Sequence, residues 1–130
     1  MFQACSALWI ERNPPPAIPA TRRRDPLAAC RTTLLQLYAW YRRNARLLAQ
    51  LTADVERVPA MRDEFARTAA YLEALASAVD RQWPRRNARR LATLRHAVAF
   101  STWRSLDEIT ASDRQSVTLV TGWLRAVSPR

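Results

Sequence analysis

Glycine is nearly absent from this chain, since Gly122 is the single glycine among 130 residues. Tight hairpin turns and phosphate-binding loops both consume glycine, because they need backbone conformations that other residues rarely adopt. A β-rich architecture and a glycine-rich nucleotide site are therefore both disfavoured. Cysteine is scarce as well, and Cys5 and Cys30 do not make a disulfide framework. This usage is typical of a reducing cytoplasm, which is the localisation that we expect.

Long apolar runs are also missing. No stretch approaches the roughly 20 apolar residues that are needed to cross a bilayer. The first residues lack the basic start and the long apolar stretch of a secretory signal. We therefore expect no membrane partner. The chain is nevertheless 48% hydrophobic, and its 130 residues suffice for one domain with a single sizeable core.

The patterns of catalytic and metal sites are not found either. His96 is the only side chain that could act as a base at neutral pH, and no carboxylate stands three or four positions away from it. No cluster of ligands indicates a metal site. Neither cysteine has the context of a nucleophile, so a structural, buried thiol is the better interpretation of each. We therefore expect no enzyme, no metal and no cofactor.

Lysine is absent, so all of the 21 basic residues are arginine, and the formal net charge is +10. Such an excess of positive charge favours a polyanionic partner such as nucleic acid. Coding bias is an alternative, since arginine in place of lysine beside abundant alanine is typical of a GC-rich genome. The arginines are also spread along the chain rather than packed into one stripe. A nucleic-acid binder driven by charge would lose its affinity steeply with added salt.

The sequence does contain helical periodicity, because apolar residues recur at spacings of three and four. No segment alternates with period two for long enough to be a strand. The predicted helices cover residues 2–13, 25–51, 58–83, 84–106 and 112–127. The predicted fold class is therefore all-α, a bundle of four long helices with a short N-terminal helix.

Residues that cap helices mark several of these boundaries. Asp25 is a predicted N-cap, followed by Pro26 at the first helical position. Ser112 and Gln115 have the spacing of a capping box. The proline-rich residues 14–24 cannot hold regular structure and are read as a linker. The resulting division is a short helix over 1–13, the linker, and one main domain over 25–130.

The predicted helix over 84–106 has apolar residues on two opposite sides, and the last helix is apolar over about half of its circumference. Two C-terminal helices with surplus apolar surface predict a homodimer interface made of two helices from each subunit. The alternative is that the helices bury one another inside a monomer. Gly122 weakens the last helix, which either permits close approach of another helix or is incidental. The predicted interface residues are Leu91, Leu94, Val98, Val117, Val120, Gly122, Trp123 and Leu124.

Aromatic residues on three of the helices could line an apolar pocket, with one histidine as a polar group. The alternative is that the same aromatics are ordinary core. The predicted pocket residues are Tyr38, Tyr41, Met61, Phe65, Leu72, His96, Phe100 and Trp103.

Several stretches of the chain, taken in order, resemble the ligand-binding and dimerisation half of the tetracycline-repressor (TetR) family of bacterial transcriptional regulators. They are FQACSALW at 2–9, NPPP at 13–16, DPLAACRTTLLQLYAWYRRNARLL at 25–48, VPAMRDEF at 58–65 and AFSTWRSL at 99–106. The resemblance implies a bacterial, cytoplasmic regulatory domain that binds a small apolar or aromatic effector. It also implies dimerisation through helices at about 85–106 and 113–127.

In such regulators a DNA-binding helix-turn-helix precedes the helix that links it to the regulatory domain. The resemblance implies that residues 1–13 are the remnant of this linking helix, so DNA is an expected partner only if an upstream helix-turn-helix is supplied. Two other functions stay open, a ligand-free helical dimerisation or interaction module and a non-specific basic nucleic-acid binder. A cavity above about 300 Å³ would favour the effector sensor, and a filled core would favour the module.

Overall fold

The computed structural model describes residues 12–128, and the part of the chain that it describes is helical without any strand. Its helices are α2 (Pro26–Asp54), α3 (Pro59–Asp80), α4 (Ala88–Ala97), α5 (Phe100–Asp107) and α6 (Asp113–Val127). The all-α prediction is confirmed for these residues. The predicted helix over 2–13 and Cys5 fall on residues 1–11, outside the described range.

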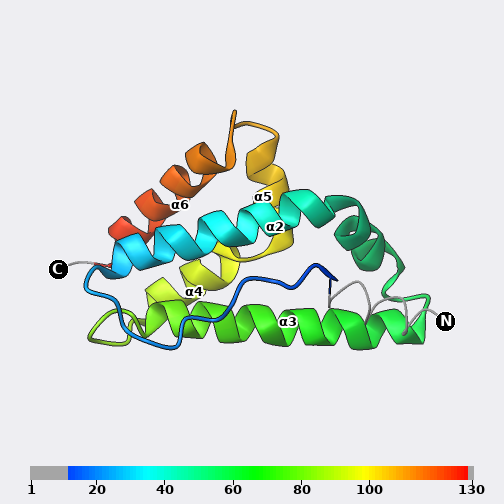
Figure 1. The fold of residues 1–130 in the computed structure, drawn as a ribbon, viewed down its shortest axis with the longest axis horizontal. Coiled ribbons are helices and arrows are strands. Elements are labelled where there is room, and N and C mark those ends of the chain that lie inside the picture. Colours follow the sequence, from blue (N-terminus) through cyan, green and yellow to red (C-terminus); the bar gives the residue numbers. More distant parts are fainter. Residues whose placement is uncertain (1–11, 129–130) are drawn as a thin grey trace.

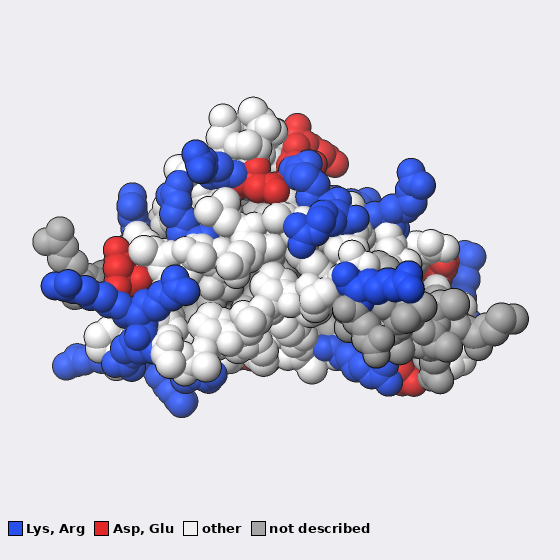
Figure 2. Space-filling view, viewed as in Figure 1, with Lys and Arg blue, Asp and Glu red and all other residues white. Residues whose placement is uncertain are grey.

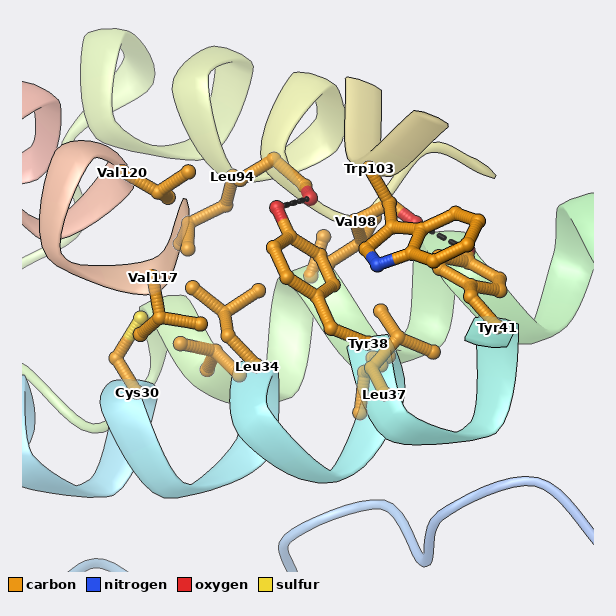
Figure 3. Close-up of a cluster of buried hydrophobic side chains, with 14 of the residues drawn as sticks. Cys30, Leu34, Leu37, Tyr38, Tyr41, Leu94, Val98, Trp103, Val117 and Val120 are labelled. Carbon is orange, nitrogen blue, oxygen red and sulfur yellow. Dashed lines mark hydrogen bonds between the residues drawn. The ribbon is translucent and has the colours of Figure 1, made fainter. Parts of the chain in front are cut away.

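Helix α2 is the centre of the arrangement, because it packs against α3, α5 and α6 (Figure 1). Helix α4 lies between α3 and α6, so all of the described helices share one core. Figure 3 shows Leu34 and Tyr38 of α2 facing Leu94 of α4 and Val117 of α6. Burial of these apolar side chains is the main stabilising contribution to such a fold.

The predicted N-caps at Asp25 and Ser112 are confirmed, but the return bond of the predicted capping box goes to Ala111 instead of Ser112. Asp25 accepts hydrogen bonds at Oδ1 from the N–H groups of Leu27 and Ala28, at 3.1 and 3.3 Å. Ser112 Oγ accepts one from the N–H of Gln115 at 3.2 Å, and the Gln115 side chain accepts one from the N–H of Ala111 at 2.9 Å. These contacts satisfy backbone donors that have no partner within the helix.

The linker is not helical, as predicted, but it is attached to the domain along its length. We call residues 13–24 the strap. The Trp40 indole N–H donates to the carbonyl of Asn13 at 2.9 Å, and the Tyr71 hydroxyl donates to the carbonyl of Pro16 at 2.5 Å. Gln82 holds the far end of the strap, since its Nε2 donates to the carbonyl of Thr21 at 3.0 Å. In Figure 1 the strap, drawn in blue, crosses in front of the space between α2 and α3.

The prediction of one helix over 84–106 is wrong, because the chain forms two short helices there with a break at Val98 and Ala99. Ala99 is extended, with φ −67° and ψ 139°. In a continuous helix the carbonyls of Ala97 and Val98 would accept N–H groups four residues later. Instead, the carbonyl of Ala97 accepts a hydrogen bond from the buried hydroxyl of Tyr38 at 2.7 Å, and that of Val98 accepts one from the buried hydroxyl of Tyr41 (Figure 3). Two side chains of α2 thus take the place of the backbone donors.

Other boundaries also differ from the prediction, so the bundle does not consist of four long helices. Helix α4 begins at Ala88, where Asn87 caps it, instead of at Pro84. Helix α3 ends at Asp80 instead of Trp83. Asp80 is buried and accepts a hydrogen bond from Arg90 Nε at 2.7 Å, which joins the ends of α3 and α4. Helix α2 continues to Asp54 and contains the non-helical residue Asn44, with φ −120° and ψ 16°.

Replacing Tyr38 by phenylalanine should lower the free energy of unfolding by about 1–3 kcal/mol, because it leaves the buried carbonyl of Ala97 without a donor. Tyr71→Phe is the matched control. Tyr71 is only half-buried and donates to the strap, so water can replace its hydroxyl. Urea denaturation followed by circular dichroism measures both. Equal losses in the two variants would contradict a special role for the Tyr38 hydroxyl.

Candidate functional site

An apolar cleft of about 460 Å³ lies between α2, α3 and α5. Helix α2 contributes Tyr41, Leu48, Leu51 and Thr52, and α3 contributes Phe65, Thr68, Ala69 and Leu72. The third wall consists of Ala99, Phe100, Ser101, Arg104, Ser105 and Glu108. The cleft therefore exists because the chain turns at Ala99 and brings the first residues of α5 opposite two long helices.

Aromatic rings build the inner end of the cleft. The ring of Phe100 meets that of Tyr41 edge-on, with centroids 5.3 Å apart, and stacks on that of Trp103 at 5.7 Å. The guanidinium of Arg104 lies 5.7 Å from the Phe100 centroid. Phe65 faces these groups from α3 and is 43% exposed, so an apolar side chain of this wall is open to solvent. Such surfaces suit flat apolar ligands.

The polar groups of the cleft are few. Thr52 and Thr68 donate to the carbonyls of Leu48 and Glu64, each at 2.9 Å, so their hydroxyls are left as acceptors. Arg104 and Glu108 lie on the wall formed by residues 99–108. Within residues 12–128, neither forms an ion pair shorter than 4.0 Å. A few polar groups on an apolar wall are typical of a binding site that orients its ligand.

A cluster of charged and aromatic groups fixes the position of α5 behind the cleft. The indole N–H of Trp103 donates to Asp113 Oδ1 at 3.0 Å. Arg42 donates to both oxygens of Asp113, at 2.8 and 3.2 Å, and also to Asp107. The same guanidinium lies 5.3 Å from the Trp103 ring. These contacts join α2, α5 and α6 at one point.

This cluster also shifts the pKa values of Asp113 and Arg42. Burial alone raises the pKa of Asp113, but the hydrogen bonds from Arg42 and Trp103 outweigh burial, and the net result is a lowered pKa. The hydrogen bonds to Asp113 and Asp107 raise the pKa of Arg42. Burial raises the pKa of the Tyr41 hydroxyl above its ordinary value, in agreement with its role as a hydrogen-bond donor to the carbonyl of Val98.

Half of the predicted pocket residues line the cleft. Tyr41, Phe65, Leu72 and Phe100 are part of its wall. Tyr38, Met61 and Trp103 are buried but are not part of that wall. His96 is a correction, because it is exposed on α4 and its ring lies 6.0 Å from that of Trp123 of α6, away from the cleft.

The prediction missed several residues of the cleft, including Leu48 and Leu51. Both lie on the face of α2 that contains Tyr41, at helical spacings of seven and ten, so periodicity could have found them. Ala69 follows Phe65 at a spacing of four on α3, so periodicity could have placed it on the same face. Arg104 and the serines of α5 carried no such signal, because the turn at Ala99 that orients them is not encoded by periodicity.

Most of the predicted dimer-interface residues lie inside the core of a single chain. Leu94, Val98, Val117, Val120 and Leu124 are at most 2% exposed, so in this fold they are not available to a second copy. Three residues remain towards the surface. Leu91 and Trp123 are half-buried, and Gly122 is exposed. A Cβ atom at Gly122 would meet nothing within 4 Å, so no close approach to this glycine occurs within the described chain.

Outside the cleft, the described residues show neither a reactive thiol nor a metal-binding cluster. Cys30 is a buried free thiol, and burial raises its pKa to about 12, which suppresses the reactive thiolate. Within residues 12–128, no three histidine, cysteine or acidic side chains come together in a way that could hold a metal ion. In the same part of the chain, no helix combines the length and the apolar character needed to cross a membrane.

Because the pKa of Asp113 is lower in the folded chain, protonation of this group favours the unfolded state. Its contribution to stability is complete above the ordinary carboxyl pKa of about 3.9 and is lost as the pH falls through and below it. Asp113→Asn should lower the free energy of unfolding at pH 7 by about 1–2 kcal/mol and flatten its decline in acid. Urea denaturation between neutral and acidic pH tests this.

Asp63→Asn is the control, because Asp63 is exposed on α3 and forms no ion pair shorter than 4.0 Å with any described residue. Its acid profile should match that of the unmodified chain. If the free energy of unfolding of Asp113→Asn fell in acid as steeply as that of the unmodified chain, the assignment of the acid sensitivity to this cluster would be contradicted.

Comparison with known proteins does not assign the chain to a family. No protein-family model matches it, and no curated protein or solved structure matches it either. The interpretation of its function therefore depends on the cleft and on the sequence pattern.

Proposed function

We propose that this chain is the effector-sensing and homodimerisation domain of a TetR-like transcriptional regulator. The observation that carries the proposal is the apolar cleft between α2, α3 and α5. Its volume of about 460 Å³ exceeds the roughly 300 Å³ at which small-molecule pockets begin. The ligand class that fits the rings of Phe65 and Phe100 is a small apolar or aromatic molecule.

A ligand in this cleft would act on α5 more than on any other element. Helix α5 supplies one wall of the cleft, and Trp103 ties it to Asp113 at the start of α6. Helix α3 is continuous where it lines the cleft, whereas α2 is interrupted at Asn44, between Tyr41 and Leu48. Helix α5 has only eight residues, so we take it as the wall whose position a ligand can bias. In a regulator with a DNA-binding domain, a difference in ligand affinity between two positions of α5 would couple the cleft to DNA binding.

The outer faces of α4 and α6 are the surface proposed for dimerisation. Leu119 is 44% exposed there, and Trp123 is half-buried, with its ring 6.0 Å from that of His96. A Cβ atom at Gly122 would meet nothing within 4 Å, so the surface of α6 is open at this position to a helix of a second copy. This surface replaces the interface predicted from sequence, whose apolar residues are mostly internal.

A ligand-free dimerisation module is the second candidate, because the same outer surface would serve it equally well. The two candidates differ only in the cleft. A module has no need of a cleft that takes up an apolar molecule, whereas a sensor does.

We expect the chain to bind the neutral aromatic probe N-phenyl-1-naphthylamine saturably, with one site per chain. Ala69→Trp should weaken binding by about tenfold or more, because an indole there would occupy the cleft. Ala70→Trp adds the same side chain to the exposed neighbouring position outside the cleft, and its affinity should match that of the unmodified chain. Probe fluorescence measures the affinity. Equal affinity in both variants, or no saturable binding, would exclude this cleft as the site.

We also expect the chain to elute as a dimer in size-exclusion chromatography with light scattering. Leu119→Arg should yield monomers, because a guanidinium would be buried without a partner at the interface. Ile109→Arg is the control. Ile109 is 76% exposed in the turn before α6, away from the proposed surface, so this variant should remain dimeric. A dimer that survives Leu119→Arg would place the interface elsewhere.

A further inference from the structure

The arginines that are scattered along the sequence converge in part at one end of the folded chain. Three consecutive arginines close the strap, and four more lie at the end of α3, in the following loop and at the start of α4. All seven are exposed. We call them the arginine end, and its members are Arg22, Arg23, Arg24, Arg81, Arg85, Arg86 and Arg89.

Hydrogen bonds hold the two groups of arginines beside each other across nearly 60 residues of sequence. Gln82 is buried and accepts a hydrogen bond at Oε1 from the backbone N–H of Arg23 at 2.8 Å. Its Nε2 donates to the carbonyl of Thr21 at 3.0 Å. Arg22 Nε donates to the carbonyl of Arg81 at 3.3 Å. Figure 2 shows basic side chains clustered at the end of the molecule where Figure 1 places the α3–α4 loop and the C-terminal end of α6.

The positive charge of this end is not neutralised by the protein. None of the seven arginines forms an ion pair shorter than 4.0 Å with a described residue. The acidic residues of these segments are Asp25, which caps α2, and Asp80, which is buried and paired with Arg90. Like charges held together repel one another, so the arrangement gains stability when an anion neutralises it.

The chemistry of this surface fits a duplex better than a membrane or a single strand. Guanidinium groups bind phosphate through paired N–H donors. Among the described residues, no large apolar side chain is exposed over residues 81–89, and the strap exposes only Ile18, so this surface has little that could enter a lipid layer. Trp83 is the aromatic residue of the loop, and the Arg90 guanidinium covers its ring at 4.5 Å. This cation covers one face of the ring, and the partly buried side chain also packs against the core, so Trp83 is poorly placed to stack on a base of a single strand.

We propose that the arginine end binds the phosphodiester backbone of double-stranded nucleic acid without reading its bases. This activity is separate from the effector cleft and from any helix-turn-helix. It follows from charge and geometry alone, so it predicts equal binding to unrelated sequences and a strong dependence on salt.

The test is fluorescence anisotropy with a labelled DNA duplex of about 20 base pairs, titrated over a range of salt concentrations that starts near 50 mM. Replacing Arg85, Arg86 and Arg89 by glutamine should make the plot of log affinity against log salt shallower by roughly 2–3 and weaken binding by about tenfold or more. A duplex of RNA with the same sequence measures whether the surface distinguishes the two backbones. Binding of either duplex supports the proposal.

The matched control replaces Arg43, Arg46 and Arg57 by glutamine. These arginines are also exposed and form no ion pair shorter than 4.0 Å with a described residue, and they belong to the second half of α2 and the turn after it. The change in net charge is the same as in the first variant. Equal losses in the two triple variants would overturn the proposal, because binding would then reflect overall charge.

A third variant, Gln82→Met, keeps every arginine but removes the two hydrogen bonds that hold the strap. We expect weaker duplex binding with unchanged net charge, and unchanged affinity would overturn the role of the gathered arrangement. Circular dichroism and binding of N-phenyl-1-naphthylamine should be the same in all variants, since the cleft lies elsewhere. Tighter binding to single-stranded DNA, or binding to phosphatidylserine vesicles without duplex binding, would also overturn the proposal.

Discussion

Two buried hydroxyl groups determine how the second half of this chain folds. The carbonyls of Ala97 and Val98 are inside the core, where an acceptor without a donor is costly. Tyr38 and Tyr41, on one face of α2, supply the donors from outside the helix. The backbone is then free to adopt an extended conformation at Ala99 and to start a new helix in another direction. Without these donors, a continuous helix would be the better way to satisfy the same carbonyls.

The cleft follows from this turn. A straight helix through Phe100 would continue the direction of α4, whereas the turned α5 stands opposite α2 and α3 and encloses the apolar space. Trp103, Asp113 and Arg42 then hold α5 against α2 and α6. The residues that would contact a ligand and the residues that connect the helices are therefore neighbours on one short helix. This arrangement is the physical basis for the coupling that we propose between ligand binding in the cleft and the position of α5.

Charged side chains have different roles at different depths of the structure. The Asp80–Arg90 pair is buried and joins α3 to α4, so it contributes to specifying how these helices meet. The arginines of the strap and the α3–α4 loop are exposed and without acidic partners among the described residues. The sequence alone does not distinguish the buried, paired Arg90 from the exposed arginines. Only their burial and their neighbours separate a structural role from a role in binding.

The sequence by itself determined the helical class, the caps at Asp25 and Ser112, and four residues of the cleft wall, because capping and amphipathic periodicity are local. Tertiary structure decided the break after α4, the outward position of His96 and the burial of Val117 and Leu124 within one chain. It also decided that arginines on the strap and beyond α3 lie together. Each of these depends on hydrogen bonds or packing between residues many turns apart, such as Tyr38 with Ala97 or Gln82 with Thr21, and the periodicity of one helix carries no information about them.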